Sequence, residues 1–152
     1  MGQCFSVDVT DTDTDETTMG GLTSAATIRP RIYDLIIGSF GAPADAASSY
    51  HLQRYTVAGT STAVTPQPLE PAETAFVSRL AATTGENHSG EPTYTAAAIL
   101  LVIPINQRAT FRWVAREGKE IILPAVAANG AGLIVRESSS AHTMHATFHE
   151  EE

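Results

Sequence analysis

The stretch RATFRWVAR, residues 108–116, carries the clearest strand pattern in the chain. Small and aromatic residues alternate here with mostly polar and basic ones, which places the two sets on opposite faces of a β-strand. The face that carries Phe111 and Trp113 is the expected core face, and the opposite face carries Arg108, Arg112 and Arg116. We expect these arginines either to pair with carboxylates on a neighbouring strand or to form a protein interface, where arginine is enriched.

Short segments of the same kind recur on both sides of this stretch. Glycine, proline and serine separate them at intervals of roughly 8–12 residues, which is the spacing of an all-β sandwich or barrel. We therefore predict an all-β fold, a compact antiparallel β-sandwich or jelly-roll-like barrel of about eight strands. The expected strands include residues 31–40, 50–57, 94–105, 107–115, 120–123, 133–136 and 143–148.

Two segments are expected to act as arms of a single β-sandwich domain that spans residues 28–152. Residues 1–27 are acidic and are predicted to form an extended, flexible N-terminal arm, because low hydrophobicity and self-repulsion favour disorder. Residues 64–71 contain three prolines and are predicted to form an extended arm within the domain. The candidate partner contacts in these arms are Asp11, Asp13, Asp15, Pro66, Pro68 and Leu69.

Charge is distributed unevenly along the 152 residues, which include nine basic and seventeen acidic side chains and have a formal net charge of −8. Eight acidic residues lie within 8–16 and 150–152, so residues 17–149 carry nine acids and nine bases. The absence of a clustered basic surface argues against a nucleic-acid partner. No apolar run approaches the roughly 20 residues of a membrane span, and the N-terminus lacks a secretory signal pattern. We therefore expect no membrane partner.

Candidate catalytic and metal-binding motifs are incomplete. The run from Asp11 to Asp15 begins like a calcium loop, but the sixth and twelfth positions, which need Gly and Glu, hold Glu16 and Leu22. His145 and His149 would lie about 13 Å apart on a strand, too far for one metal, although copies around a symmetry axis could converge on an ion. Neither a nucleophile elbow nor a phosphate-binding loop is present. We expect no catalytic residue, no cofactor and no metal, and a protein that is not an enzyme.

The order of several segments along residues 28–150 adds a resemblance to these patterns. The segments are RIYDLIIG (31–38), LQRYT (52–56) with Gly59-Thr60, TPQPLE (65–70), NQRATFRWVA (106–115), Pro124-Ala125, GAGL (130–133) and ATFHE (146–150). In this order they resemble the auxiliary capsid proteins of tailed bacteriophages, known as decoration or cement proteins. The acidic start of the chain is not part of the resemblance.

The resemblance implies a compact β fold that binds the outside of an assembled shell and staples neighbouring capsomers. The expected protein is then a virion structural protein, made in the host cytoplasm and located on the outer surface of the capsid. Its expected partners are the major capsid protein and further copies of itself, with a trimer favoured over a dimer. Extended arms and many copies suit such a role, because weak contacts add up on a repeating lattice.

Two other functions remain open at this point. One is a receptor- or carbohydrate-binding β-sandwich of a phage head or tail fibre, in which loop tyrosines such as Tyr50 or Tyr94 would contact sugars. The other is a cupin-type jelly-roll enzyme, which would need clustered metal-binding histidines.

Overall fold

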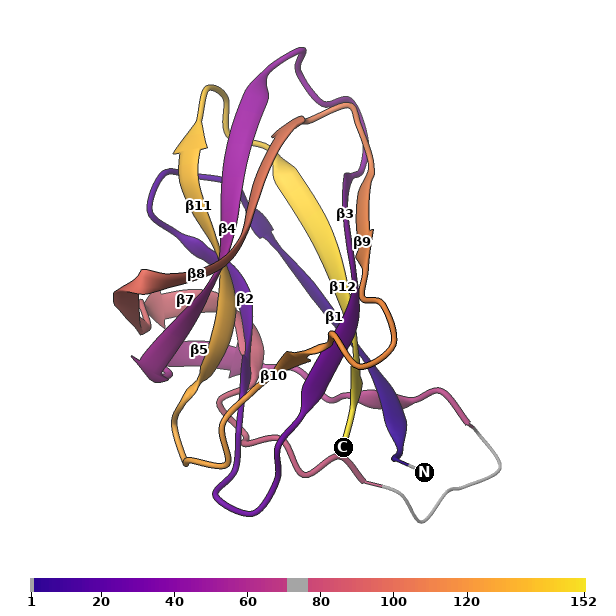
Figure 1. The fold of residues 1–152 in the computed structure, drawn as a ribbon. Helices are drawn as coiled ribbons and strands as arrows, with labels where there is room; N and C mark the ends of the chain where they lie inside the picture. The colour runs from indigo at the N-terminus through magenta and orange to yellow at the C-terminus, as the bar shows by residue number, and fades with distance from the viewer. Residues whose placement is uncertain (1, 71–76) are drawn as a thin grey trace.

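The computed structural model describes residues 2–70 and 77–152, and it folds these residues into strands and loops without a helix. The strands form two antiparallel sheets packed together, which confirms the all-β sandwich (Figure 1). Within the described residues the sheets stay open, so the barrel alternative is wrong. Twelve strands are present in these ranges rather than about eight. They are β1 (Cys4–Thr12), β2 (Thr18–Thr23), β3 (Arg31–Ser39), β4 (Ala47–Val57), β5 (Thr60–Ala63), β6 (Gln67–Pro68), β7 (Gly85–Gly90), β8 (Thr93–Asn106), β9 (Phe111–Val114), β10 (Ile121–Ile122), β11 (Gly130–Ser138) and β12 (Thr143–Glu151).

The two layers have different strand orders. Sheet A has the order β10-β3-β12-β1-β6, and β9 also pairs with β3. Sheet B has the order β5-β7-β2-β11-β4-β8. Sheet A therefore brings the two ends of the chain into one layer, and sheet B has β8 at one edge.

Alternating side chains of both sheets fill the space between the layers. Along β12, Met144, Ala146 and Phe148 are buried while the residues between them are half-buried or exposed, as period-2 alternation requires. Sheet B contributes Leu52 and Leu133 to the same core. On β9, Phe111 and Trp113 are partly buried against this core, which confirms their expected orientation.

The prediction of a flexible N-terminal arm over residues 1–27 is wrong. β1 lies between β12 and β6, and β2 lies between β7 and β11. Phe5, Val7 and Val9 alternate with polar residues and point into the core, where they are at most 2% exposed. Burial of three large apolar side chains outweighs the charge of the acids on this segment. The N-terminal acids therefore belong to a strand and a turn of the sandwich.

The C-terminal glutamates are also part of sheet A rather than a separate acidic end. β1 and β12 pair antiparallel from Cys4↔Glu151 to Thr12↔Thr143, so the two chain ends lie side by side (Figure 1). The backbone N–H of Gly2 donates to Oε1 of Glu151 over 3.0 Å. Glu152 accepts hydrogen bonds from the Ser78 hydroxyl and the Arg79 backbone N–H.

The described part of the Pro-rich arm, residues 64–70, runs along the edge of β1. β6 pairs with β1 through Phe5↔Pro68 and Ser6↔Gln67, and the backbone N–H of Leu69 donates to the carbonyl of Cys4. Pro66 is half-buried, and Leu69 is 48% exposed. Position 71 of the predicted arm lies outside the described residues.

Candidate functional site

Strand β8 forms the edge of sheet B, and among the described residues it pairs with β4 alone. None of its 14 residues is charged, and every residue from Ala96 to Ile105 is apolar. Proteins usually shorten edge strands or place charges on them, because an open backbone edge pairs readily with another chain. In β8 only Pro104, which lacks a backbone N–H, interrupts the row of donors between Ile99 and Ile105. This edge is suited to receiving a further strand.

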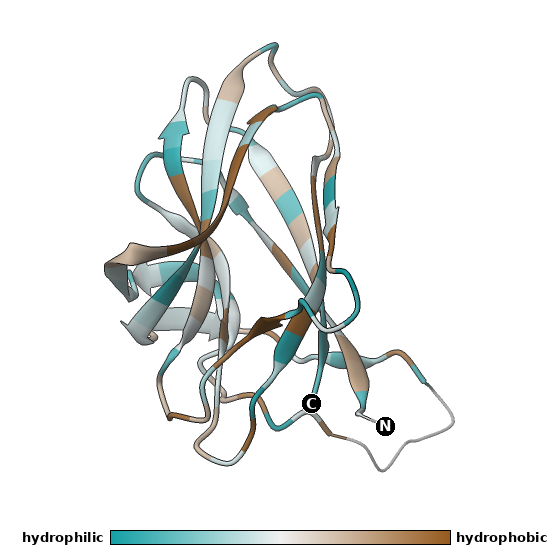
Figure 2. Cartoon of the chain, viewed as in Figure 1, coloured by the Kyte–Doolittle hydropathy of each residue, from teal (hydrophilic) through white to brown (hydrophobic). Residues whose placement is uncertain are grey.

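The two faces of β8 have different surroundings. Ile103 is 1% exposed, and Leu101 and Ile105 are partly buried against the core, so this face fixes the strand to the sandwich. Ile99 and Val102 are 42% and 59% exposed. Figure 2 shows the strand as a largely hydrophobic band on the outside of the molecule. We call the exposed edge formed by residues 99–104 the β8 edge.

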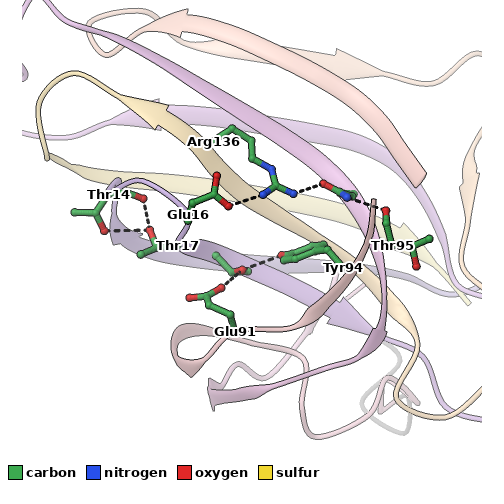
Figure 3. Close-up of polar contacts among 9 residues, drawn as sticks. Thr14, Glu16, Thr17, Glu91, Tyr94, Thr95 and Arg136 are labelled. Atoms are coloured by element: carbon green, nitrogen blue, oxygen red, sulfur yellow. Dashed lines mark hydrogen bonds and ion pairs between the residues drawn. The ribbon is translucent and has the colours of Figure 1, made fainter. Parts of the chain in front are cut away.

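Side chains hold the first half of β8 where its backbone pairing with β4 is irregular (Figure 3). The Tyr94 hydroxyl lies 2.8 Å from Thr18 Oγ1, and Gln53 Nε2 donates to the carbonyl of Thr95 over 2.8 Å. Tyr94 lies against Gly132, where a Cβ would overlap its hydroxyl. Absence of a side chain at Gly132 therefore allows the tyrosine to pack onto the sheet.

Arg136 ties this cluster to the N-terminal turn (Figure 3). Its guanidinium donates to Glu16 Oε2 over 2.5 Å and to Gln53 Oε1 over 2.6 Å, and it lies 5.8 Å from the centre of the Tyr94 ring. The Thr18 hydroxyl also donates to Glu91. These contacts fix the start of β8, and pairing with β4 and burial of Ile103 fix its second half, which lowers the entropy lost on binding.

On the outer face of sheet A, one of the three candidate arginines, which is itself exposed, forms an ion pair with a buried aspartate. Arg112 donates to both carboxylate oxygens of Asp34, over 3.0 and 2.8 Å, and His149 Nδ1 donates to the same carboxylate over 2.9 Å. The Asp34 side chain is only 3% exposed. Arg112, followed by His149, lowers the pKa of Asp34 despite its burial. For Arg112 the expected pairing with a neighbouring strand is thus correct.

The other two candidate arginines do not join this cluster. β9 ends at Val114, so Arg108 and Arg116 lie in the turns on either side of it rather than on one strand face. Nε of Arg108 donates to the carbonyl of Pro43 over 3.3 Å. Arg116 is exposed, and its side chain forms no hydrogen bond or ion pair with the described part of the chain. The prediction of a continuous arginine face is wrong, because β9 is too short to include Arg108 and Arg116.

The acidic candidates are separated by the turn after β1. Asp13 is wholly buried and accepts hydrogen bonds from Ser48, Tyr50, Gln107 and the backbone N–H of His142. Asp15 is exposed and accepts from the backbone N–H of Ser138. Burial raises the pKa of Asp11, which accepts from the backbone N–H of Thr12. Asp13 is therefore structural, and the three do not form one surface.

The possible metal ligands and the two candidate tyrosines also have defined places in the fold. No group of three or more His, Cys, Asp or Glu residues in the described ranges is placed to hold a metal ion. The proposed sugar-contacting tyrosines lie on strands rather than loops: Tyr50 is wholly buried and Tyr94 is half-buried. No described helix is long and apolar enough to cross a membrane.

Sequence reasoning missed two features of the structure, the β8 edge and the contact between Asp34 and His149. The uncharged run 96–105 is visible in the sequence, but its place at a sheet edge depends on the strand order. Asp34 and His149 lie on strands that are neighbours in sheet A but far apart in the chain. No local sequence pattern predicts their contact. Comparison with known proteins adds no relative: no family model, no curated protein and no solved structure matches the chain.

Proposed function

We propose that this chain is a non-enzymatic virion structural protein that binds the outer surface of a phage capsid and stabilises contacts between capsomers. The observation that carries the proposal is the β8 edge, which is long, uncharged and apolar and is held in place before binding. The major capsid protein is the proposed partner, and we propose that the chain acts as a homo-oligomer, with a trimer favoured over a dimer.

The physical basis of the proposal is strand addition. An extended segment of a shell protein can pair with the open backbone of β8 while its side chains contact Ile99 and Val102. Each contact is small, but an oligomer that binds several capsomers at once gains affinity through multivalency. Such binding needs an accessible edge rather than an enclosed pocket.

The test measures the amount of the protein on purified particles. Stripped shells are mixed with wild-type protein or with Val102→Lys, and the bound protein is quantified by mass spectrometry against the shell protein. Lysine at an exposed edge position opposes strand addition without entering the core. The matched control is Val114→Lys on β9, because Val114 is 56% exposed, close to the 59% of Val102.

We expect wild-type protein and Val114→Lys to bind in a fixed ratio to the shell protein, and Val102→Lys to bind at least about tenfold more weakly, the factor that corresponds to about 1.4 kcal/mol. Absence of the wild-type protein from particles would refute the proposed function. Equal binding of both lysine variants would place the contact elsewhere on the molecule.

A further inference from the structure

A second surface lies on the outer face of sheet A, away from the β8 edge. It is a shallow pocket of about 320 Å³ lined by Ile36, Gly38, Ser39, Phe40, Thr110, His145 and Thr147. Pockets for small ligands begin at about this size. We propose that this pocket binds one pyranose ring of a neutral saccharide, a function that goes beyond attachment to a shell and does not depend on it.

The hollow exists because Gly38 contributes no side chain to the outer face of β3. Gly38 pairs with His145 of β12, and its neighbour along the same face, Ile36, pairs with Thr147. Thr110 lies on the other side, where a Cβ added to Gly38 would be 3.4 Å from its Oγ1. Ile36 provides the apolar floor, and two threonines and a histidine surround it.

Phe40 forms an exposed aromatic wall of the pocket. It is 76% exposed, so the face of its ring is open to contact by a ligand. His142 Nε2 donates to the Phe40 carbonyl over 2.8 Å, and the His145 ring meets the Phe40 ring edge-on at 6.2 Å between centroids. The ring is therefore positioned in advance.

The lining matches the two chemical sides of a pyranose. The apolar C–H face of the sugar can cover Phe40 and Ile36, while its hydroxyls reach polar side chains at the rim. The side chains of Thr110 and His145 form no hydrogen bond with the described part of the chain and so remain available. Thr147 donates its proton to Asp8 but keeps its oxygen as an acceptor.

The charge of the lining favours a neutral sugar. Among the residues that the structure describes, neither a carboxylate nor a lysine or arginine lines the pocket. Arg112 pairs with Ile36 in the register, but its guanidinium is bound by both oxygens of Asp34. An acidic sugar would therefore lose hydration without meeting a free cation.

A bound peptide strand is less suited to this place. β3 already pairs with β12 on one side and with β9 on the other across residues 34–37. Strand addition needs an open backbone edge, and the pocket lies on the face of the sheet instead. Recognition must then come from side chains, which suits a ligand rich in hydroxyls.

The test uses the full chain labelled with ¹⁵N and titrated with three probes: methyl α-D-glucopyranoside, methyl β-D-galactopyranoside and N-acetyl-D-glucosamine. We expect at least one probe to shift the amide signals of Gly38, Phe40, Thr110 and His145. Phe40→Ala should weaken this binding about tenfold, because the stacking contact is lost, and Phe40→Tyr should retain it. Val126→Ala, a change at an exposed loop residue, serves as the control and should bind as the wild type does.

Three results would overturn the proposal. The first is no shift at the four amides with any of the three sugars. The second is unchanged sugar binding by Phe40→Ala. The third uses acetyl-leucine amide as an additional probe: shifts at these amides with this compound but with none of the sugars. The last result would identify the pocket as a peptide side-chain site. Loss of shell attachment by Val102→Lys with normal sugar binding would separate this site from the proposed function.

Discussion

At the scale of single residues, Glu150 is the group whose charge is least compatible with its surroundings. It is wholly buried on the core side of β12, and neither carboxyl oxygen has a hydrogen-bond donor among the described residues. Burial, followed by the nearby Glu152 carboxylate, raises the pKa of Glu150 from 4.5 to about 9. The folded protein therefore holds a proton that the unfolded chain releases in neutral solution.

This proton makes stability depend on pH in a defined direction. The contribution of Glu150 is fully present below the unfolded pKa of 4.5 and is lost as the pH rises toward the folded value of about 9. Between about pH 5 and about pH 8, the free energy of unfolding should fall by on the order of 4 kcal/mol from this group. Glu150→Gln, which has no ionisable proton, should remove that fall, as measured by urea denaturation at both pH values.

The exposed turn residue Glu117 gives the control for this measurement, as Glu117→Gln. The pH profile of this variant should follow the wild type, because the substitution leaves the buried Glu150 in place. Parallel profiles for the wild type and Glu150→Gln would show that the Glu150 carboxyl ionises normally in the folded protein.

At the scale of elements, β1 and β12 show why some strands could be predicted and others were missed. Buried Met144, Ala146 and Phe148 alternate with uniformly polar neighbours, and β12 was expected from this pattern. Phe5, Val7 and Val9 alternate in the same way, but the acids that follow them led to the prediction of a disordered arm. Charge density is a weak guide here, because the face of a strand that points to solvent accepts acids readily.

The candidate site depends on information that local patterns do not contain. The alternation of residues 108–116 correctly predicts that Phe111 and Trp113 face the core, but not the arginine face, because β9 spans only Phe111–Val114 and leaves two arginines in turns. The place of β8 at an edge and the meeting of Asp34 with His149 are set by strand order. Sequence periodicity determines which face of a strand is buried, and long-range pairing determines what lies beside it.

A matched pair of phenylalanine variants tests whether β1 is a structural strand. Phe5 is wholly buried and Phe40 is 76% exposed, so truncation to alanine should affect the free energy of unfolding strongly at Phe5 and little at Phe40. Phe5→Ala should lower the free energy of unfolding by about 3–5 kcal/mol through lost burial and a cavity. Phe40→Ala should change it by no more than about 0.5 kcal/mol. Chemical denaturation followed by circular dichroism measures both, and a small effect of Phe5→Ala would support a flexible arm.

At the scale of the whole molecule, the two chain ends are neighbours in one sheet, but their acids are spread over both layers. β1 and β12 pair antiparallel, so Glu151 lies beside Cys4 while Asp8 lies beside Thr147, farther along the pair. The acids that follow β1 lie in a turn, where Asp15 and Glu16 bond to β11 of the other sheet. Charge therefore does not distinguish the two layers, and the long uncharged strand at a sheet edge is β8. The absence of charge on β8 permits association at this edge.

The β8 edge can pair with one added strand, and we propose that this strand comes from the shell protein. Self-association should therefore use another surface and leave the β8 edge open. A closed trimer joins one surface of each copy to a different surface of the next, since three identical contacts around one axis are head-to-tail. Sedimentation velocity over a range of concentrations should show a trimer for the wild type and also for Val102→Lys, because its lysine lies on the edge that faces the shell protein. A wild type that stays monomeric throughout would contradict the trimer, and dissociation of Val102→Lys alone would show that the edge joins copies of this chain instead.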